Sequence, residues 1–234
     1  YCKQLMRSIK NSKRGVQISL GALLLLDLGR SVYYALHFYP QYDECWNYNY
    51  FLSNSFFTTL FAYNNYPLHN ILTYGTLKLL PDSTFVMRLP NIVLGLINVT
   101  LVFCMIRKVF KNEKLAIAAS AIFAVLPTVV FYMLFARGVM LSITFSLLLL
   151  FFFLIKKIEH WKKIDILLVA ILSALGSFSM ISFPIFLLVL FLFYIIKFLV
   201  SANQAAVRKI WYCSIWIVLF TGILYLPMFL GSGF

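Results

Sequence analysis

Charge is scarce in this sequence, and negative charge is the scarcest. Only 12% of the 234 residues are charged, with 7 Asp and Glu residues against 20 Lys and Arg residues. Hydrophobic residues make up 62% of the chain, and the mean hydropathy is +0.91. A typical soluble domain carries about 25% charged residues. The composition therefore excludes a soluble domain and predicts an all-α fold, a polytopic bundle of membrane helices.

The patterns of metal sites and disulfide frameworks are also absent. The three histidines have no ligand spacing, so a structural zinc site is not expected. The four cysteines are scattered and include no Cys-x-x-Cys pair. We expect no metal and no other cofactor, with a divalent cation held by Asp43, Glu44 and Asp82 as the alternative.

Long apolar runs dominate what is present. A spanning helix needs about 20 apolar residues, and seven segments approach that length, so about seven transmembrane helices are predicted. The loop between the first two, residues 39–87, is rich in Tyr, Asn and Phe. Its one apolar run, 68–80, is too short to cross and is expected to lie along the membrane interface. The predicted spans are 15–38, 88–109, 115–135, 138–155, 164–180, 183–200 and 210–230.

The basic residues set the orientation of these spans. Sixteen of the 20 Lys and Arg residues gather in four clusters that fall on one side of a seven-span arrangement. Positive residues mark the cytoplasmic side. Residues 1–14 are therefore expected to form a cytoplasmic basic N-terminus, and residues 15–234 a transmembrane core with interfacial helices in the outer loop 39–87. The positive charge is explained by topology, so nucleic acid is not an expected partner.

Two arginines and two carboxylates are predicted to share the outer face. Arg88 and Arg137 each lie nineteen residues before an inner basic residue, about 28 Å of helix. Asp43 and Glu44 follow the outer end of the first span. Arginine binds phosphate through two parallel hydrogen bonds, and a carboxylate can accept a proton from a hydroxyl. The alternative is that both arginines reach lipid phosphates without a specific partner.

The order of several short motifs resembles a known superfamily. The motifs are Tyr42-Asp43-Glu44, Asn64-Asn65-Tyr66-Pro67-Leu68, Asp82-Ser83, Arg88-Leu89-Pro90 and Phe135-Ala136-Arg137. Together they resemble the GT-C membrane glycosyltransferases over residues 20–180, and most closely the protein O-mannosyltransferase and aminoarabinose-transferase branch. The chain departs from many relatives at 66–69, where they have His-Pro-Pro. Relatives usually continue into further spans and an outer soluble domain, so a C-terminal region is expected to be missing here.

The resemblance implies a reaction and roles for individual residues. A sugar would move from a polyprenyl-phosphate donor to an acceptor hydroxyl at the outer face, with inversion. Asp43 would be the general base, and Glu44 would bind the acceptor or tune Asp43. Arg137 and Arg88 would bind the donor phosphate. The expected substrate contacts are His69, Asn65 and Tyr42. The sequence has no Gly-rich phosphate loop, which favours a lipid-linked donor over a nucleotide sugar.

Two other classes of function stay open at this stage. One is a scaffold subunit that has the same fold but no activity and holds partners within a membrane complex. The other is a transporter, for which Asp27 and Arg30 of the first span are the available ionisable residues. We expect a bacterial inner membrane with the site facing the periplasm, and an endoplasmic reticulum membrane as second choice. The acceptor, a protein or a glycolipid, is not identified by the sequence.

Overall fold

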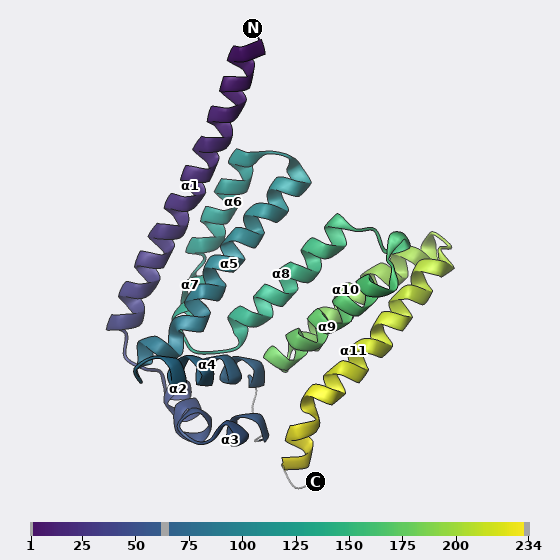
Figure 1. Cartoon of the computed structure of the whole chain (residues 1–234). Coiled ribbons are helices and arrows are strands. Elements are labelled where there is room, and N and C mark those ends of the chain that lie inside the picture. The colour runs from purple at the N-terminus through teal and green to yellow at the C-terminus, as the bar shows by residue number, and fades with distance from the viewer. Residues whose placement is uncertain (1, 62–65, 232–234) are drawn as a thin grey trace.

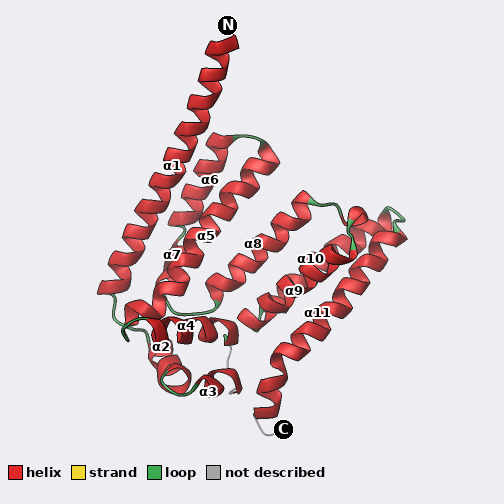
Figure 2. Cartoon of the chain, viewed as in Figure 1, coloured by secondary structure: helices red, strands yellow, loops and turns green. Residues whose placement is uncertain are grey.

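A computed structural model describes residues 2–61 and 66–231, and the side chains of 15–58 and 66–231. Throughout these described ranges the regular structure is helical, with short connecting loops (Figure 2). This confirms the predicted all-α class. The helices are α1 (Cys2–His37), α2 (Tyr42–Asn47), the π-helical η1 (Tyr48–Leu52), α3 (Phe56–Phe61), α4 (Pro67–Leu79), α5 (Thr84–Phe110), α6 (Glu113–Val125), α7 (Pro127–Leu134), α8 (Val139–Ile155), the 3-10 helix η2 (Ile158–His160), α9 (Lys163–Ser179), α10 (Phe183–Val200) and α11 (Gln204–Gly231).

All seven predicted spans coincide with helices, but they differ in length. Among the described residues, four helices are long and apolar enough to cross a membrane, namely Gly15–His37 of α1, α5, α10 and α11, and a fifth span results if α6 and α7 are counted as one bent helix. The other two predicted spans, α8 and α9, have 17 residues each, which is about 26 Å of helix and the lower limit for crossing.

The helix pair α6 and α7 is bent by 59° at Leu126, where the sequence predicted one continuous span. Pro127 begins α7 and lacks the N–H group that would continue the hydrogen-bond ladder of α6. The carbonyl of Ala124, in the last turn of α6, accepts a hydrogen bond of 2.9 Å from Arg30 of α1. Arg30 is also ion-paired with Asp27, one turn earlier on α1. The bend directs the end of α7 toward the outer loop.

The predicted outer loop contains a layer of short helices at one end of the bundle. Helices α2, α3 and α4 gather at the lower end of Figure 1, where α1 ends and α5 begins. The predicted interfacial run 68–80 lies in α4. The connection between α7 and α8, residues 135–138, is at the same end, so segments separated by some 90 residues in the sequence come together here.

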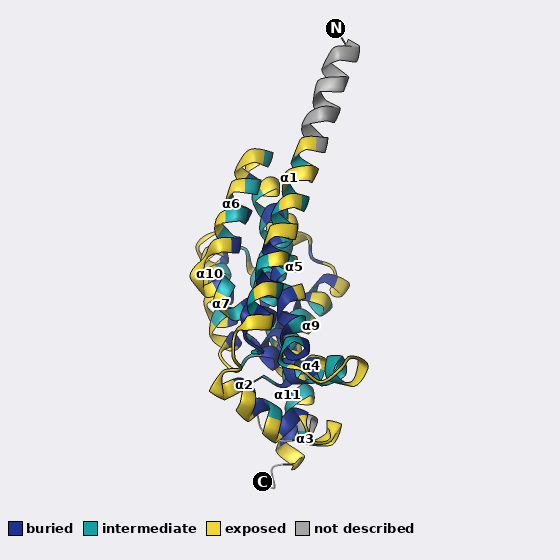
Figure 3. Ribbon diagram, turned by 90° about the vertical axis from the view of Figure 1, so that its left-hand side faces the viewer, coloured by how far each residue is buried: buried dark blue, intermediate teal, exposed yellow. Residues whose placement is uncertain are grey.

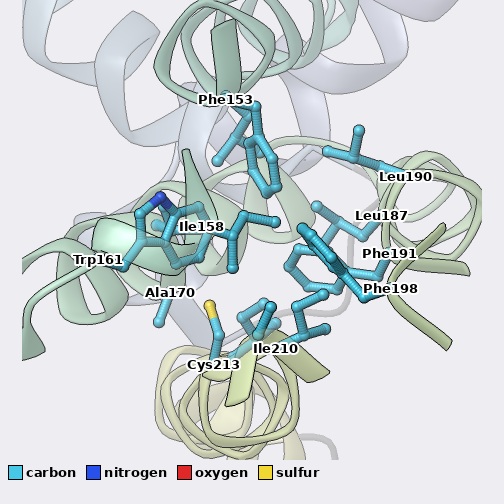
Figure 4. Close-up of a cluster of buried hydrophobic side chains, with 14 of the residues drawn as sticks. Phe153, Ile158, Trp161, Ala170, Leu187, Leu190, Phe191, Phe198, Ile210 and Cys213 are labelled. Atoms are coloured by element: carbon cyan, nitrogen blue, oxygen red, sulfur yellow. The ribbon is translucent and has the colours of Figure 1, made fainter. Parts of the chain in front are cut away.

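The apolar core lies in the second half of the chain. Side chains of α8, η2, α9, α10 and α11 converge on one buried cluster (Figure 4). Within this cluster Trp161 packs edge-on against Phe153, with ring centroids 5.0 Å apart. By contrast, only three of the residues 15–37 of α1 are buried (Figure 3), which suits a helix that faces lipid. Seven buried polar residues, Glu44, Asn47, His69, Asn70, Thr73, Arg88 and Asn91, belong to α2, α4 and the first part of α5, and they define the site.

Candidate functional site

The two adjacent carboxylates of α2 have opposite environments. Neighbouring residues of a helix project about 100° apart, so Asp43 and Glu44 cannot face the same way. Asp43 has 53% of its side chain exposed, and the side chain of Glu44 is fully buried. Gln41 caps α2, and its N–H donates to Glu44 Oε2 at 3.0 Å, which fixes the start of the helix. The resemblance implied that Glu44 binds the acceptor or tunes Asp43, but the fold turns the two carboxylates away from each other.

Glu44 and Arg88 form a bidentate ion pair inside the protein. Arg88 Nε lies 3.0 Å from Glu44 Oε1, and Arg88 Nη2 lies 2.7 Å from Glu44 Oε2. Both side chains are fully buried. The remaining guanidinium hydrogens reach main-chain carbonyls at the end of α1, at 3.1 Å for Ala35, 3.0 Å for Phe38 and 3.2 Å for Tyr39. Arg88 thereby joins α1, α2 and α5.

Asp43 pairs with Arg137 at the edge of a cavity. The guanidinium of Arg137 contacts Asp43 Oδ2, and 26% of its side chain is exposed. Both residues line a cavity of about 290 Å³ between α2 and the 135–138 loop. Its other lining residues are Tyr42, Trp46, Asn47, Phe51, Tyr66 and Ala136. The predicted base and the predicted phosphate ligand therefore meet, both of them open to solvent.

The 135–138 loop is held from two sides. The N–H of Ala136 donates to Glu44 Oε1 at 2.8 Å. On the other side, Asn91 of α5 donates its amide hydrogens to the carbonyl oxygens of Tyr132, Phe135 and Arg137. Sequence reasoning missed Asn91. Its signal was an amide side chain in an otherwise apolar span, where such a group needs partners.

Another missed pair joins α2 to α4. Asn47 and Asn70 are buried and exchange two hydrogen bonds, at 2.8 Å and 2.9 Å. Together with Glu44 and Arg88 they make the wall behind the cavity polar and rigid. Each amide satisfies the other, so neither leaves a costly unpaired group in the interior.

The remaining predicted contacts have three different outcomes. Tyr42 lines the cavity and is 80% exposed. Asn65 lies outside the described residues. His69 lies in α4 and is fully buried. Its Nδ1 atom lies 3.4 Å from Thr73 Oγ1. Burial lowers the pKa of His69 to about 4, although hydrogen bonding with Asn70 and Asn91 and the charge of Glu44 oppose this decrease. His69 is thus a neutral interior group and not, in this conformation, a contact for a substrate.

Arg88 also differs from its predicted placement. It was expected at the outer mouth of the second span, available to phosphate. The helix instead begins one turn earlier at Thr84, where the hydroxyl of Ser83 accepts a hydrogen bond from the N–H of Val86. Arg88 is therefore drawn inside the protein, where protein acceptors occupy Nε, Nη1 and Nη2.

A second cavity of about 290 Å³ lies on the other side of α2. Tyr48 and Asp82 line it and are hydrogen-bonded to each other. This hydrogen bond, together with burial and the charge of Asp82, raises the pKa of Tyr48. Within the described ranges, no three His, Cys, Asp or Glu side chains lie together as a metal site would require.

Gly138 offers a direct test of how closely the loop must pack. A Cβ at this position would lie 2.2 Å from the main-chain oxygen of Ser179 in α9. We expect Gly138→Ala to displace the loop, lower the free energy of unfolding by about 1–3 kcal/mol and reduce any activity that depends on Arg137. Gly75→Ala is the control, because nothing lies within 4 Å of a Cβ there. Thermal unfolding in detergent measures both, and equal stability of the two variants would contradict the prediction.

Fold and site together define an integral membrane protein with a carboxylate–arginine site between α2 and the 135–138 loop. The chain belongs to the dolichyl-phosphate-mannose-protein mannosyltransferase family, whose sequence model matches residues 64–230. This is a family of membrane glycosyltransferases that use a dolichyl-phosphate sugar, which confirms the predicted relationship. The matched segment contains Arg88 and Arg137 but begins after Asp43. Neither the comparison with curated proteins nor that with solved structures gives a match.

Proposed function

We propose that this protein transfers a sugar from a polyprenyl-phosphate donor to an acceptor hydroxyl, with inversion at the anomeric carbon. The observation that supports this most directly is the meeting of Asp43 and Arg137 in one solvent-open cavity. A transferase of this kind needs a base and a cation within reach of one sugar ring, and these two side chains are the complementary pair that lines the cavity.

The resting ion pair suggests how the donor engages the site. The phosphate of the donor competes with Asp43 for the guanidinium of Arg137, which can bind phosphate in a bidentate fashion. Asp43 is then free to accept the proton of the acceptor hydroxyl while the hydroxyl oxygen attacks the anomeric carbon. The bond from that carbon to the phosphate oxygen breaks, and Arg137 stabilises the negative charge on the departing polyprenyl phosphate.

In this proposal Glu44 and Arg88 have a role that differs from the one inferred from sequence. They orient the site without contacting a substrate. Their mutual hydrogen bonds hold α2 against α1 and α5, so that Asp43 projects into the cavity. Tyr42, beside Asp43 and exposed, is the proposed contact for the sugar or the acceptor.

Transfer of a labelled sugar tests the proposed function. Membranes containing the protein are incubated with radiolabelled polyprenyl-phosphate sugars of several kinds, and the label is followed into protein and glycolipid fractions. We expect one donor to lose its sugar in the presence of the wild-type protein and to keep it with Arg137→Ala. Transfer is expected to persist in EDTA, because the proposal assigns no step to a metal. Equal label movement with and without the protein would refute the proposed function.

Of the two alternatives, the scaffold is distinguished by the same assay, since it predicts no transfer with any donor. The transporter hypothesis depended on Asp27 and Arg30. Arg30 is ion-paired with Asp27 and donates to the carbonyl of Ala124 at the α6–α7 bend. This arrangement favours a structural role for them at the bend.

For orientation, we propose that the cavity faces the side opposite the basic clusters, as the positive-inside rule predicts. In a bacterium that side is the periplasm, and in a eukaryotic cell it is the lumen of the endoplasmic reticulum. Accessibility of an introduced cysteine at the exposed Tyr42 to a membrane-impermeant thiol reagent distinguishes the two sides of the membrane.

A further inference from the structure

Asn91 is fully buried and does not line the cavity, yet three of its contacts are to the segment that carries Arg137. Its Nδ2 lies 3.2 Å from the carbonyl oxygen of Tyr132 and 2.9 Å from that of Arg137, and it also donates to Phe135. Helix α7 ends at Leu134, so carbonyl groups at its end need partners from outside the helix.

The contacts of Glu44 explain why Asn91 is needed. In a continued helix the N–H of Ala136 would bond to the carbonyl of Tyr132. Here that N–H donates instead to Glu44 Oε1 at 2.8 Å, and the carbonyl of Tyr132 is left for Asn91. Arg137 therefore follows a turn whose N–H and carbonyl groups are fixed by side chains from two different helices, Glu44 of α2 and Asn91 of α5.

The orientation of the Asn91 amide is determined by its surroundings. Turned over, Oδ1 would face three carbonyl oxygens, with no hydrogen to share. With Nδ2 toward the loop, Oδ1 has no hydrogen-bond partner, and neither does the buried Nε2 of His69. Asn91 opposes the decrease in the pKa of His69, although no hydrogen bond joins Oδ1 to Nε2 in the structure. A neutral His69 with its proton on Nε2 would complement this oxygen, and Nδ1 would then accept a hydrogen bond from Thr73 Oγ1 at 3.4 Å.

We propose that Asn91 is a positioning residue that fixes the turn at 135–137 and so directs the guanidinium of Arg137 into the Asp43 cavity. This inference rests on the proposed function, in which Arg137 binds the donor phosphate. It assigns Asn91 no contact with the substrate. The loss of Asn91 is expected to act only through Arg137.

A double-mutant cycle tests the inference. The affinity for a short-chain polyprenyl phosphate is measured by isothermal titration calorimetry with the wild-type protein, Asn91→Ala, Arg137→Ala and the double variant. We expect each single change to weaken binding at least about tenfold, and the double variant to bind no more weakly than Arg137→Ala. Two independent effects would multiply instead, and non-additivity is the mark of residues that act as one unit.

Asn98 supplies a matched control on the same helix. It is two turns beyond Asn91, equally buried, also has an unpartnered Oδ1, and donates to the carbonyl of Met140 at 3.2 Å. Asn98→Ala is expected to keep the wild-type affinity within about twofold. Asn91→Ser, which retains a hydroxyl donor, is expected to bind with intermediate affinity, and it serves if Asn91→Ala does not fold.

The outcomes are distinguishable from one another. Multiplying effects, or wild-type affinity in both Asn91 variants, would overturn the positioning role while Arg137 keeps its place in the site. Equal binding by the wild-type protein and Arg137→Ala would instead refute the proposed function, and the positioning role with it. Equal losses from Asn98→Ala and Asn91→Ala would show a general effect of buried amides and would also overturn the inference.

Discussion

Replacing Asp43 by Asn is expected to reduce sugar transfer by about 10²- to 10⁴-fold, the usual contribution of a positioned general base. The amide keeps the size of the side chain but cannot accept the proton of the attacking hydroxyl. Because the Asp43–Arg137 pair is partly exposed, the effect on the free energy of unfolding is expected to be less than about 1 kcal/mol.

The same variant is expected to bind polyprenyl phosphate at least as tightly as the wild-type protein. Removing the carboxylate frees Arg137 from its resting partner, so the phosphate no longer competes with an anion. Asp82→Asn is the matched control: it removes an exposed outer-loop carboxylate bonded to Tyr48, outside the Asp43 cavity. Transfer is measured with the labelled donor and binding by calorimetry. Undiminished turnover by Asp43→Asn would remove this residue from the mechanism.

Replacing Arg88 by Met is expected to cost about 3–5 kcal/mol of unfolding free energy, because it leaves the carboxylate of Glu44 buried without its counter-ion. The three carbonyl groups at the end of α1 also lose their donors. The expected result is a large decrease in the thermal transition measured in detergent, or failure to accumulate in the membrane.

Two further variants separate the charge effect from loss of packing. Adding Glu44→Gln to Arg88→Met removes the uncompensated charge and is expected to recover part of the stability. Arg107→Ala breaks the exposed pair with Glu113, where Nη2 and Oε1 are 3.0 Å apart and half of the arginine side chain is exposed. Its expected cost is below about 1 kcal/mol. A similar cost for Arg88→Met and Arg107→Ala would contradict the structural role of the buried pair.

That Asp43 and Arg137 lie at the same end of the bundle could be anticipated from topology alone. Counting residues from the inner basic clusters placed Arg137 at the outer boundary, and the acidic doublet followed the end of the first span. Those inferences depend only on helix rise and membrane thickness, which are the same for every span. Whether Arg88 faces solvent or the interior depends on where α5 begins, and the Ser83 cap places that start one turn before Arg88. Counting residues from the basic clusters could not predict the position of this helix start.

The polar wall behind the site could not be predicted because its members pair across distant segments. Asn47 with Asn70, and Asn91 with the 135–138 loop, have spacings that leave no local pattern. The bend between α6 and α7 did have a local signal in Pro127. A continuous apolar run across that proline favoured a single span, and the bend was missed.

One peptide bond separates Asp43, which faces the cavity, from Glu44, which is anchored in the interior. A rotation of α2 that moved Asp43 away from the cavity would break the two hydrogen bonds between Glu44 and Arg88 and the one that Glu44 accepts from the N–H of Ala136. The proposed base is therefore held more firmly in position than a side chain on a flexible loop would be. Activity and folded structure are therefore expected to be lost at the same concentration of a denaturing detergent.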